Sequence, residues 1–550
     1  MPEQKPTRGQ RRQTRSEQPY YKWIVLGTVV FSLLIILLDV TVVNVSIPRI
    51  LTDFHTDISS VQWVFNAYTL AFAASLITFG RLGDMFGHKT LFLLGLLVFG
   101  IGSIASGAAP DINWLIGFRT LQGIGGAMMM PATLALLLDA FPKEQRGVAL
   151  GFWGAAAGIA LTIGPLLGGF ITDTYTWRWI FYINVPVVLL AMLLTVTFIH
   201  QRKGQRPKHR LDLAGFATVT GGLLALVFAL IEGQKYGWGS AVIVSLLVAA
   251  VVLLGLFVFV ERRALEPMIN LKLFKDRDFA IGNLIALLIS FALLGAFFLI
   301  PLFVQQVLGF SAFKSGLITV PMSAVMLVAA PNVGRLSDRY GTRWFLVSGL
   351  ALATVGLWML SHFSTNTTAT DLILPFAVFG LGMACVMPVM VNVALANVPA
   401  TQYGAGSGVL NTSRQLGGVL GIAIVGTFFT SQVASLVPSA LERNPKVPPA
   451  VTESISNQLN DGKVQLTESS QVAVDLEKIP PAQRAQSRRL ATKIGESVQA
   501  TIGPQVATAV NRTFRFALIF TLLGAVAAWF VRPPKRRKGE SADIANIAAG

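Results

Sequence analysis

GRLGDMFG at residues 80–87 and GRLSDRYG at residues 334–341 are two copies of one motif, and this repeat decides the fold. Each copy stands between two long apolar segments, so each is predicted to be a tight turn between neighbouring membrane-spanning helices. Because the second copy begins 254 positions after the first, the chain is expected to consist of two related halves. Parallel repeats of this kind are the plan of a large class of membrane transporters.

The composition agrees with a membrane protein. Of the 550 residues, 53% are hydrophobic and 13% are charged, against roughly 25% charged in a soluble domain. The formal net charge of +17 would suit a nucleic-acid-binding protein, but the basic residues lie mostly in loops between apolar segments, which excludes that class. Cys385 is the single cysteine of the sequence, so no internal disulfide forms.

Fourteen apolar segments have the length of about 20 residues that a helix needs to cross a bilayer. They lie at 23–47, 60–79, 90–108, 112–138, 147–172, 178–199, 211–232, 240–260, 279–308, 312–333, 343–362, 371–395, 405–430 and 511–531. The short segments on one side of these spans carry 28 Lys and Arg residues, and those on the other side carry four. This asymmetry predicts that both termini are cytoplasmic.

The position of the repeat gives the domain plan. The second copy follows the tenth span, whereas two adjoining six-span halves would place it after the eighth, so two spans are inserted between the halves. The plan is a basic cytoplasmic tail (1–22), a six-helix half (23–199), an inserted helix pair with basic flanks (200–278), a second six-helix half (279–531) and a basic cytoplasmic tail (532–550). The expected fold class is an all-α integral membrane protein with fourteen transmembrane helices.

One long segment, 431–510, is expected on the outer face between the last two spans. Within it, Leu490, Ile494 and Val498 have helical spacing and suggest one amphipathic helix. Two interpretations are open for the segment, a connector without structure or a cap over the outer mouth.

The turn motif is expected to latch one conformation, with ordinary loop charges as the alternative. Glycines permit the tight reversal, and a carboxylate at a helix end can bind the N-terminus of another helix. The latch residues are Gly80, Arg81, Asp84, Gly87 and Lys89, with Asp338 in the second copy. Although the turn ends in Lys89-Thr90 like a phosphate-binding loop, His88 stands where that motif requires glycine, which excludes nucleotide binding.

Three further segments narrow the family. They are LDVTVVNVSIP at 38–48, RTLQGIGG at 119–126, and GAAAG at 154–158 followed by GPLLGG at 164–169. With the turn motif, they resemble the signatures of the major facilitator superfamily, and within it those of the fourteen-span drug:proton antiporters. The resemblance covers nearly the whole chain apart from the tails and 431–510, and its fifth-span element implies export by antiport.

The fifth span contains two small-xxx-small pairs, which let helix backbones approach closely, and a proline that bends the helix. We expect its small residues to form a packing face that seals and reopens, with plain tight packing as the alternative. The gate residues are Gly154, Gly158, Gly164, Pro165, Gly168 and Gly169.

Asp39 and Arg119 are charges inside spans, and such charges mark a functional path by default. At about 1.5 Å per residue they lie at similar depths below the outer surface. A nearby cation stabilises a carboxylate whereas desolvation favours its neutral form, so Asp39 is predicted to take up and release the coupling proton. The alternative is a static pair that holds spans 1 and 4 together. Asp39 is the only acid expected well inside a span.

Arg414 is a third charge inside a span, and the second half offers no intramembrane acid to pair with it. It is expected either to hold an anionic group or to bond to helix carbonyls. Other polar and aromatic residues are candidates for lining the substrate cavity, although each singly is more often a helix–helix contact. The candidate cavity residues are Asn44, Trp63, Asn66, Tyr68, Gln122, Asn184, Asn283 and Arg414.

The predicted function is proton-coupled export of lipophilic drugs or toxic small molecules by alternating access. A dedicated exporter of one antibiotic or metabolite, or an importer on the same fold, is the alternative. Five histidines in loops or at span ends and no nucleophile–base constellation argue against an enzyme. No cofactor, metal or nucleic acid is expected, since the proton gradient drives transport. The expected location is the cytoplasmic (inner) membrane of a bacterium, as a monomer.

Overall fold

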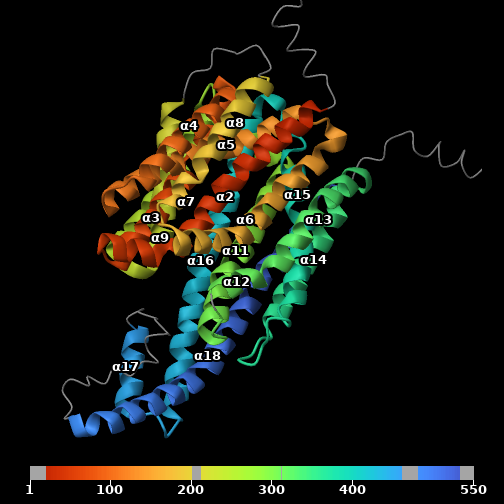
Figure 1. The fold of residues 1–550 in the computed structure, drawn as a ribbon. Coiled ribbons are helices and arrows are strands. Elements are labelled where there is room, and N and C mark those ends of the chain that lie inside the picture. Colours follow the sequence, from red (N-terminus) through yellow and green to blue (C-terminus); the bar gives the residue numbers. More distant parts are fainter. Residues whose placement is uncertain (1–19, 201–211, 311, 461–480, 533–550) are drawn as a thin grey trace, which may run out of the picture.

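The computed structural model describes residues 20–200, 212–310, 312–460 and 481–532, and within them the chain forms helices and no strand (Figure 1). Predictions for the basic tails and for most of the 200–210 loop fall outside these residues. In the described part, fourteen helical segments are long and apolar enough to cross a membrane. The predicted fold class and number of spans are therefore confirmed.

The N-terminal half contains seven α-helices in six spans. They are α2 (Tyr21–Phe54), α3 (Ile58–Phe86), α4 (His88–Gly107), α5 (Ile112–Ala140), α6 (Arg146–Thr174), α7 (Trp179–Tyr182) and α8 (Asn184–Phe198), with a 3-10 turn η1 (Lys143–Gln145) before α6. The sixth span is divided between α7 and α8. Helix α2 packs on α6, and α5 packs on both α3 and α4.

The inserted pair consists of α9 (Leu213–Tyr236) and α10 (Ala241–Arg263), followed by the 3-10 turn η2 (Leu271–Lys275). Helix α9 packs on α3 of the first half and on α16 of the second, whereas α10 packs mainly on α9. Val251 on α10 is 73% exposed, and Val252 beside it is 59% exposed. Exposed aliphatic side chains along a whole helix indicate a surface that faces lipid.

The C-terminal half begins with α11 (Arg277–Pro301), which continues into the π-helical turn η3 (Leu302–Val307). Its remaining elements are α12 (Ala312–Ile318), α13 (Val320–Tyr340), α14 (Thr342–Leu360), α15 (Ile373–Leu395), η4 (Ala400–Gln402), α16 (Tyr403–Glu442), α17 (Pro449–Asn460) and α18 (Pro481–Trp529). Helix α15 packs on α13 and α14, while α18 packs on α11, α14 and α16.

The two motif copies lie at the same end of the bundle, which we call the motif end; the opposite end is the far end. Each motif closes with a glycine between two helices, Gly87 with φ 97° and Gly341 with φ 95°. A side chain is strained in this backbone region, so the last glycine of each motif is required by the turn itself. Across the halves, α3 packs on α16 and α6 packs on α13.

The segment 431–510 is largely helical. Helix α16 continues to Glu442, α17 packs on it, and α18 starts at Pro481, so that Figure 1 shows these helices projecting beyond the far end of the bundle. Buried apolar side chains join the three helices, namely Val437, Leu441, Val447, Ile455, Leu459, Val498, Ile502 and Val506. Of the two interpretations, the connector without structure is wrong for the described residues, because the apolar spacing around Val498 continues the last spans.

Candidate functional site

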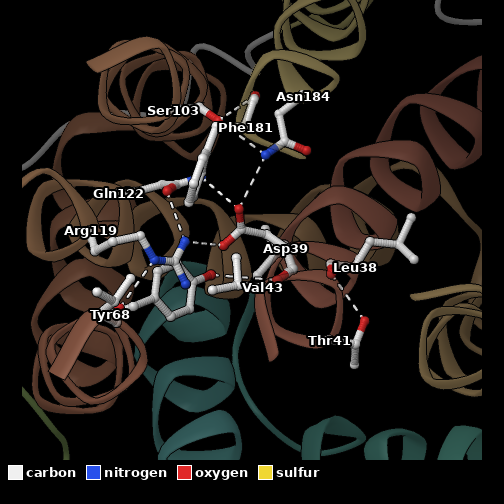
Figure 2. A network of polar contacts seen from close by, with 12 residues as sticks. Leu38, Asp39, Thr41, Val43, Tyr68, Ser103, Arg119, Gln122, Phe181 and Asn184 are labelled. Carbon is white, nitrogen blue, oxygen red and sulfur yellow. Dashed lines mark hydrogen bonds and ion pairs between the residues drawn. The ribbon is translucent and has the colours of Figure 1, made fainter. Parts of the chain in front are cut away.

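Asp39 and Arg119 form an ion pair inside the N-terminal half (Figure 2). Asp39 lies on α2 and Arg119 on α5, and the bond joins Arg119 Nη1 to Asp39 Oδ2. Both side chains are buried, with 2% of Asp39 and none of Arg119 exposed. Two opposite charges withdrawn from solvent require further hydrogen bonds to offset their desolvation.

Neutral donors from two other helices complete the environment of the Asp39 carboxylate. Gln122 Nε2 donates to Asp39 Oδ1 at 2.8 Å, and Asn184 Nδ2 donates to the same oxygen at 3.1 Å. Gln122 also accepts from Arg119 Nη1 at 2.8 Å, and Asn184 donates to Ser103 Oγ at 3.0 Å. Helices α2, α4, α5 and α8 therefore meet in one polar network that holds a single ionisable carboxyl group.

The guanidinium of Arg119 is fixed by two contacts beyond Asp39. Its Nε donates to the Val64 carbonyl at 3.2 Å, and its Cζ lies 4.4 Å from the centre of the Tyr68 ring. Both residues are on α3, so this helix supports the ion pair although it contributes no charge to it. Of the candidate cavity residues, Tyr68, Gln122 and Asn184 therefore gather around Asp39 and Arg119 (Figure 2).

Two other cavity candidates face the inserted helix. Asn66 Nδ2 donates to Glu232 Oε1 on α9 at 3.4 Å, and the Trp63 ring lies 5.5 Å from that of Phe228. Glu232 is 4% exposed, with Lys235 Nζ 3.9 Å from its other oxygen. The prediction that Asp39 is the only acid well inside a span is therefore wrong: α9 extends to Tyr236, so Glu232 lies a full turn before the helix end.

At the motif end, Asp84 caps a helix of the opposite half. Its two carboxylate oxygens accept from the backbone nitrogens of Gly404 at 2.7 Å and Ala405 at 2.8 Å, at the start of α16. A carboxylate at a helix N-terminus satisfies free N–H groups and complements the positive end of the helix dipole. Gly80, one turn earlier on α3, lies so close to Gly404 that a Cβ on either glycine would collide with the other's carbonyl.

The second motif repeats this arrangement. Asp338 Oδ2 accepts from the Gly147 nitrogen at 2.8 Å, at the start of α6, and Asp338 Oδ1 accepts from Asn392 at 3.1 Å. Gly334 and Gly147 approach as closely as Gly80 and Gly404 do. Each half thus carries an acid that caps the fifth helix of the other half, and the two contacts form what we call the paired clasp.

The remaining latch candidates have different surroundings. Lys89 Nζ donates to the Ile199 carbonyl at 2.6 Å and to the Val196 carbonyl at 3.2 Å, which ties α4 to the end of α8 within one half. Arg81 lines an open cleft of about 1420 Å³ at the motif end, between the first turn and the segment after α10. Neither residue contacts the opposite half through a hydrogen bond that the described residues show.

The fifth-span glycines divide into two sets. A Cβ on Gly154 would lie 3.1 Å from Met387 on α15, and one on Gly158 would lie 2.7 Å from Met326 on α13, both in the opposite half. Gly164 and Gly168 instead meet Thr41 and Val42 of α2, in their own half. Because ten residues turn a helix by about 280° beyond full turns, the two pairs lie on different faces rather than on one seal. Around Gly169 a Cβ would find open space, and the side chain of Pro165 lies outside the described residues.

This division predicts opposite outcomes for two leucine substitutions. Gly164→Leu collides with Thr41 inside one half, so we expect overpacking of about 1–3 kcal/mol and a clear loss of protein from the membrane. Gly158→Leu faces a flexible methionine across the halves and is expected to reach the membrane normally but to transport little. Immunoblots of membrane fractions beside efflux rates distinguish the two; normal abundance of Gly164→Leu would contradict the assignment.

Arg414 lies apart from these networks, on α16. Its Nη1 donates to Asn411 Oδ1 at 3.4 Å, and its Cζ lies 5.0 Å from the Trp153 ring of the opposite half. Asn283 on α11 is close by in the network, since it accepts from Ser413 at 3.2 Å. The side chain of Asn44, the remaining cavity candidate, lies outside the described residues.

At the far end, an exposed ion pair joins α2 to the start of the sixth span. Asp53 Oδ2 accepts from Arg178 Nη1 at 2.6 Å and from Trp177 Nε1 at 3.0 Å. The hydrogen bond from Arg178 is the main reason that the pKa of Asp53 lies below its ordinary value. This pair is charged like Asp39–Arg119 but exposed, which makes its members suitable controls.

A bundle of membrane-spanning helices in two related halves, with acids clasping one half to the other, defines a membrane transporter built on alternating halves. The chain belongs to the Major Facilitator Superfamily, whose family model matches residues 29–422.

Related proteins match over most of their length. The tetracenomycin C resistance and export protein of Streptomyces glaucescens is 31% identical over 96% of this chain and 95% of its own. The probable actinorhodin transporter of Streptomyces coelicolor is 33% identical, over 95% and 94% respectively. The multidrug resistance protein Stp of Mycobacterium tuberculosis is 35% identical over 75% of this chain and 76% of its own. These relatives support a transporter rather than an enzyme.

Solved structures share the fold. The human organic anion transporter MFSD10 gives a TM-score of 0.57 with 13% identity, covering 92% of this chain and all of its own. A bacterial homologue of the human lysosomal transporter Spinster, inward-facing and unoccupied, gives 0.55 with 17% identity, covering 94% and 98%. At such low identity the likeness concerns the fold alone.

Proposed function

We propose that this protein is a proton-coupled exporter of lipophilic drugs or toxic small molecules, and that Asp39 carries the proton. The observation behind the proposal is the buried network in which Asp39 is the single carboxyl group, faced by one cation and two neutral amides. Such a group is costly inside a membrane and has no evident structural substitute for its charge. Protonation would release Arg119 and weaken the contacts among α2, α5 and α8.

The paired clasp supplies the alternating element. Asp84 and Asp338 hold the motif end closed through backbone nitrogens of the opposite half, so opening this end requires both contacts to break. In the proposed cycle, proton uptake at Asp39 and substrate binding change the balance between the motif-end-closed state and its opposite. The names of the relatives, which include resistance and export proteins, favour export as the direction. No cofactor takes part in the proposed cycle.

A drug-susceptibility panel in a pump-deficient bacterial host tests export directly. Cells that carry the protein should tolerate higher concentrations of some lipophilic compounds than cells that carry Asp39→Asn. Equal susceptibility to every compound, with the protein present in the membrane, would exclude export of those compounds.

The proposal places the motif end in the cytoplasm of a bacterial cell and the far end outside. Ser454 on α17 is exposed at the far-end extension, so a cysteine there should react with an impermeant maleimide in intact cells, in a Cys385→Ala background. A cysteine at Gln205, in the basic loop, should react only after the membrane is permeabilised. The reverse pattern of labelling would invert the topology.

A further inference from the structure

Arg414 is a cation inside a membrane-spanning helix without a counter-ion in the described part of the chain. It lies 11 residues after the start of α16 at Tyr403, which at about 1.5 Å per residue places it roughly 16 Å along the helix. No described carboxylate pairs with it, and its Nε is buried without a hydrogen-bond partner. Its one hydrogen bond, to Asn411, is long at 3.4 Å.

Arg119 shows how this chain treats an intramembrane arginine that has a structural partner. Arg119 has a carboxylate, an amide oxygen and a backbone carbonyl, whereas Arg414 has one distant amide oxygen. The sequence left open whether Arg414 bonds to helix carbonyls, and no such bond is found among the described residues. A guanidinium stays charged and carries five donors, so this site retains an unmet demand for an acceptor.

The location of Arg414 matches that of a transported substrate. Trp153, on α6, belongs to one half and Arg414 to the other, so their contact lies between the halves, where this class of transporter binds its substrates. Trp153 is fixed by its Nε1, which donates to Thr133 at 3.2 Å. Because the indole meets the face of the guanidinium, the edge that carries Nε stays directed at neither the indole nor Asn411. That edge is the one that takes a carboxylate side-on.

We propose that Arg414 binds the acidic group of a lipophilic organic anion, with a carboxylate or phenolate oxygen accepting from its Nε edge. The substrate class is then aromatic or otherwise apolar acids, whose body lies between the halves. This inference rests on the proposed function, since it names a substrate class for the exporter. It assigns Arg414 to substrate charge and leaves the proton to Asp39.

The test compares two probes that differ in charge and little else, 9-anthracenecarboxylate and the neutral 9-anthracenecarboxamide. Binding to the full-length purified protein in lipid nanodiscs is measured by fluorescence, without a proton gradient. For Arg414→Gln we expect at least a tenfold loss of affinity for the carboxylate and no change for the amide. Arg414→Lys should fall between, because it keeps the charge and loses the planar fork.

Arg178→Gln is the matched control, since it removes one exposed arginine at the far end and should change neither affinity. Equal carboxylate affinity in wild type and Arg414→Gln would overturn the proposal, as would a parallel loss for both probes. If Arg414→Gln does not fold, Arg414→Lys still decides, because an unchanged carboxylate-to-amide ratio contradicts a side-on contact. Since no proton gradient is involved, failure here is separate from failure of Asp39 as the proton carrier.

Discussion

Asp39→Asn is expected to abolish uphill, proton-driven export while exchange down a substrate gradient survives. The substitution keeps the size and hydrogen-bonding capacity of the side chain but removes its titration, so the coupled step has no carrier. The measurement is substrate-induced proton movement in reconstituted vesicles with a set pH gradient. Wild-type protein should move protons when substrate is added, and Asp39→Asn should behave like vesicles without protein.

The structure adds a control that separates coupling from packing. Asp39→Asn leaves Arg119 buried without its counter-charge, and breaking one side of a buried pair costs about 3–5 kcal/mol. The double variant Asp39→Asn with Arg119→Gln removes both charges and should recover much of the stability. If the pair is only structural, the double variant regains coupled export; if Asp39 carries the proton, it stays uncoupled.

Two further variants complete this experiment. Arg119→Lys keeps the charge and loses the planar fork that reaches Asp39, Gln122 and Val64 together, so we expect intermediate coupling. Asp53→Asn removes an exposed carboxylate at the far end and should couple normally. Normal proton-coupled export by Asp39→Asn would leave the antiporter proposal without its main support.

The fold could be predicted from the sequence because its signals are local and repeated. A span is an uninterrupted apolar run, and the motif glycines Gly87 and Gly341 stand where only glycine suits the backbone. Charges inside apolar runs are equally visible, so Asp39, Arg119 and Arg414 were found by inspection. Ser103 was missed, because a serine in a helix carries no signal until the structure places it between Asn184 and Phe181.

Errors arose where a property depends on the exact end or face of a helix. Glu232 was counted with the loop because the apolar run ends there, yet α9 continues by another turn. The glycines of α6 were taken as one face, although the rotation between Gly158 and Gly164 directs them to different halves. The extension of α16 and α18 was hidden by polar composition, since its small core needs residues from three helices. Helix ends and helix faces are set by tertiary contacts, which a single sequence does not contain.

Gly334→Ala is expected to open the motif end and to reduce transport strongly, although it adds a single methyl group. A Cβ at this position collides with the backbone of Gly147 in the opposite half, and backbone on both sides has no rotamer with which to give way. The clasp at Asp338 depends on that approach, because its carboxylate reaches the Gly147 nitrogen at 2.8 Å. An overpacking cost of about 1–3 kcal/mol falls only on the closed state, and every 1.4 kcal/mol or so is a tenfold change in population.

The readout is the yield of cross-links between cysteines placed at Lys143 and Arg339, which are exposed on opposite halves at the motif end. We expect the yield to fall severalfold in Gly334→Ala, and likewise in Gly404→Ala, which disturbs the equivalent contact with Gly80. Gly255→Ala on α10 is the control, because a Cβ there meets nothing within 4 Å. Unchanged cross-linking in both clasp variants would mean that the halves separate elsewhere, whereas a loss at one clasp alone would show that Asp84 and Asp338 act independently. A loss at both establishes the paired clasp as one element, since a rigid half cannot release one of two symmetry-related contacts and keep the other.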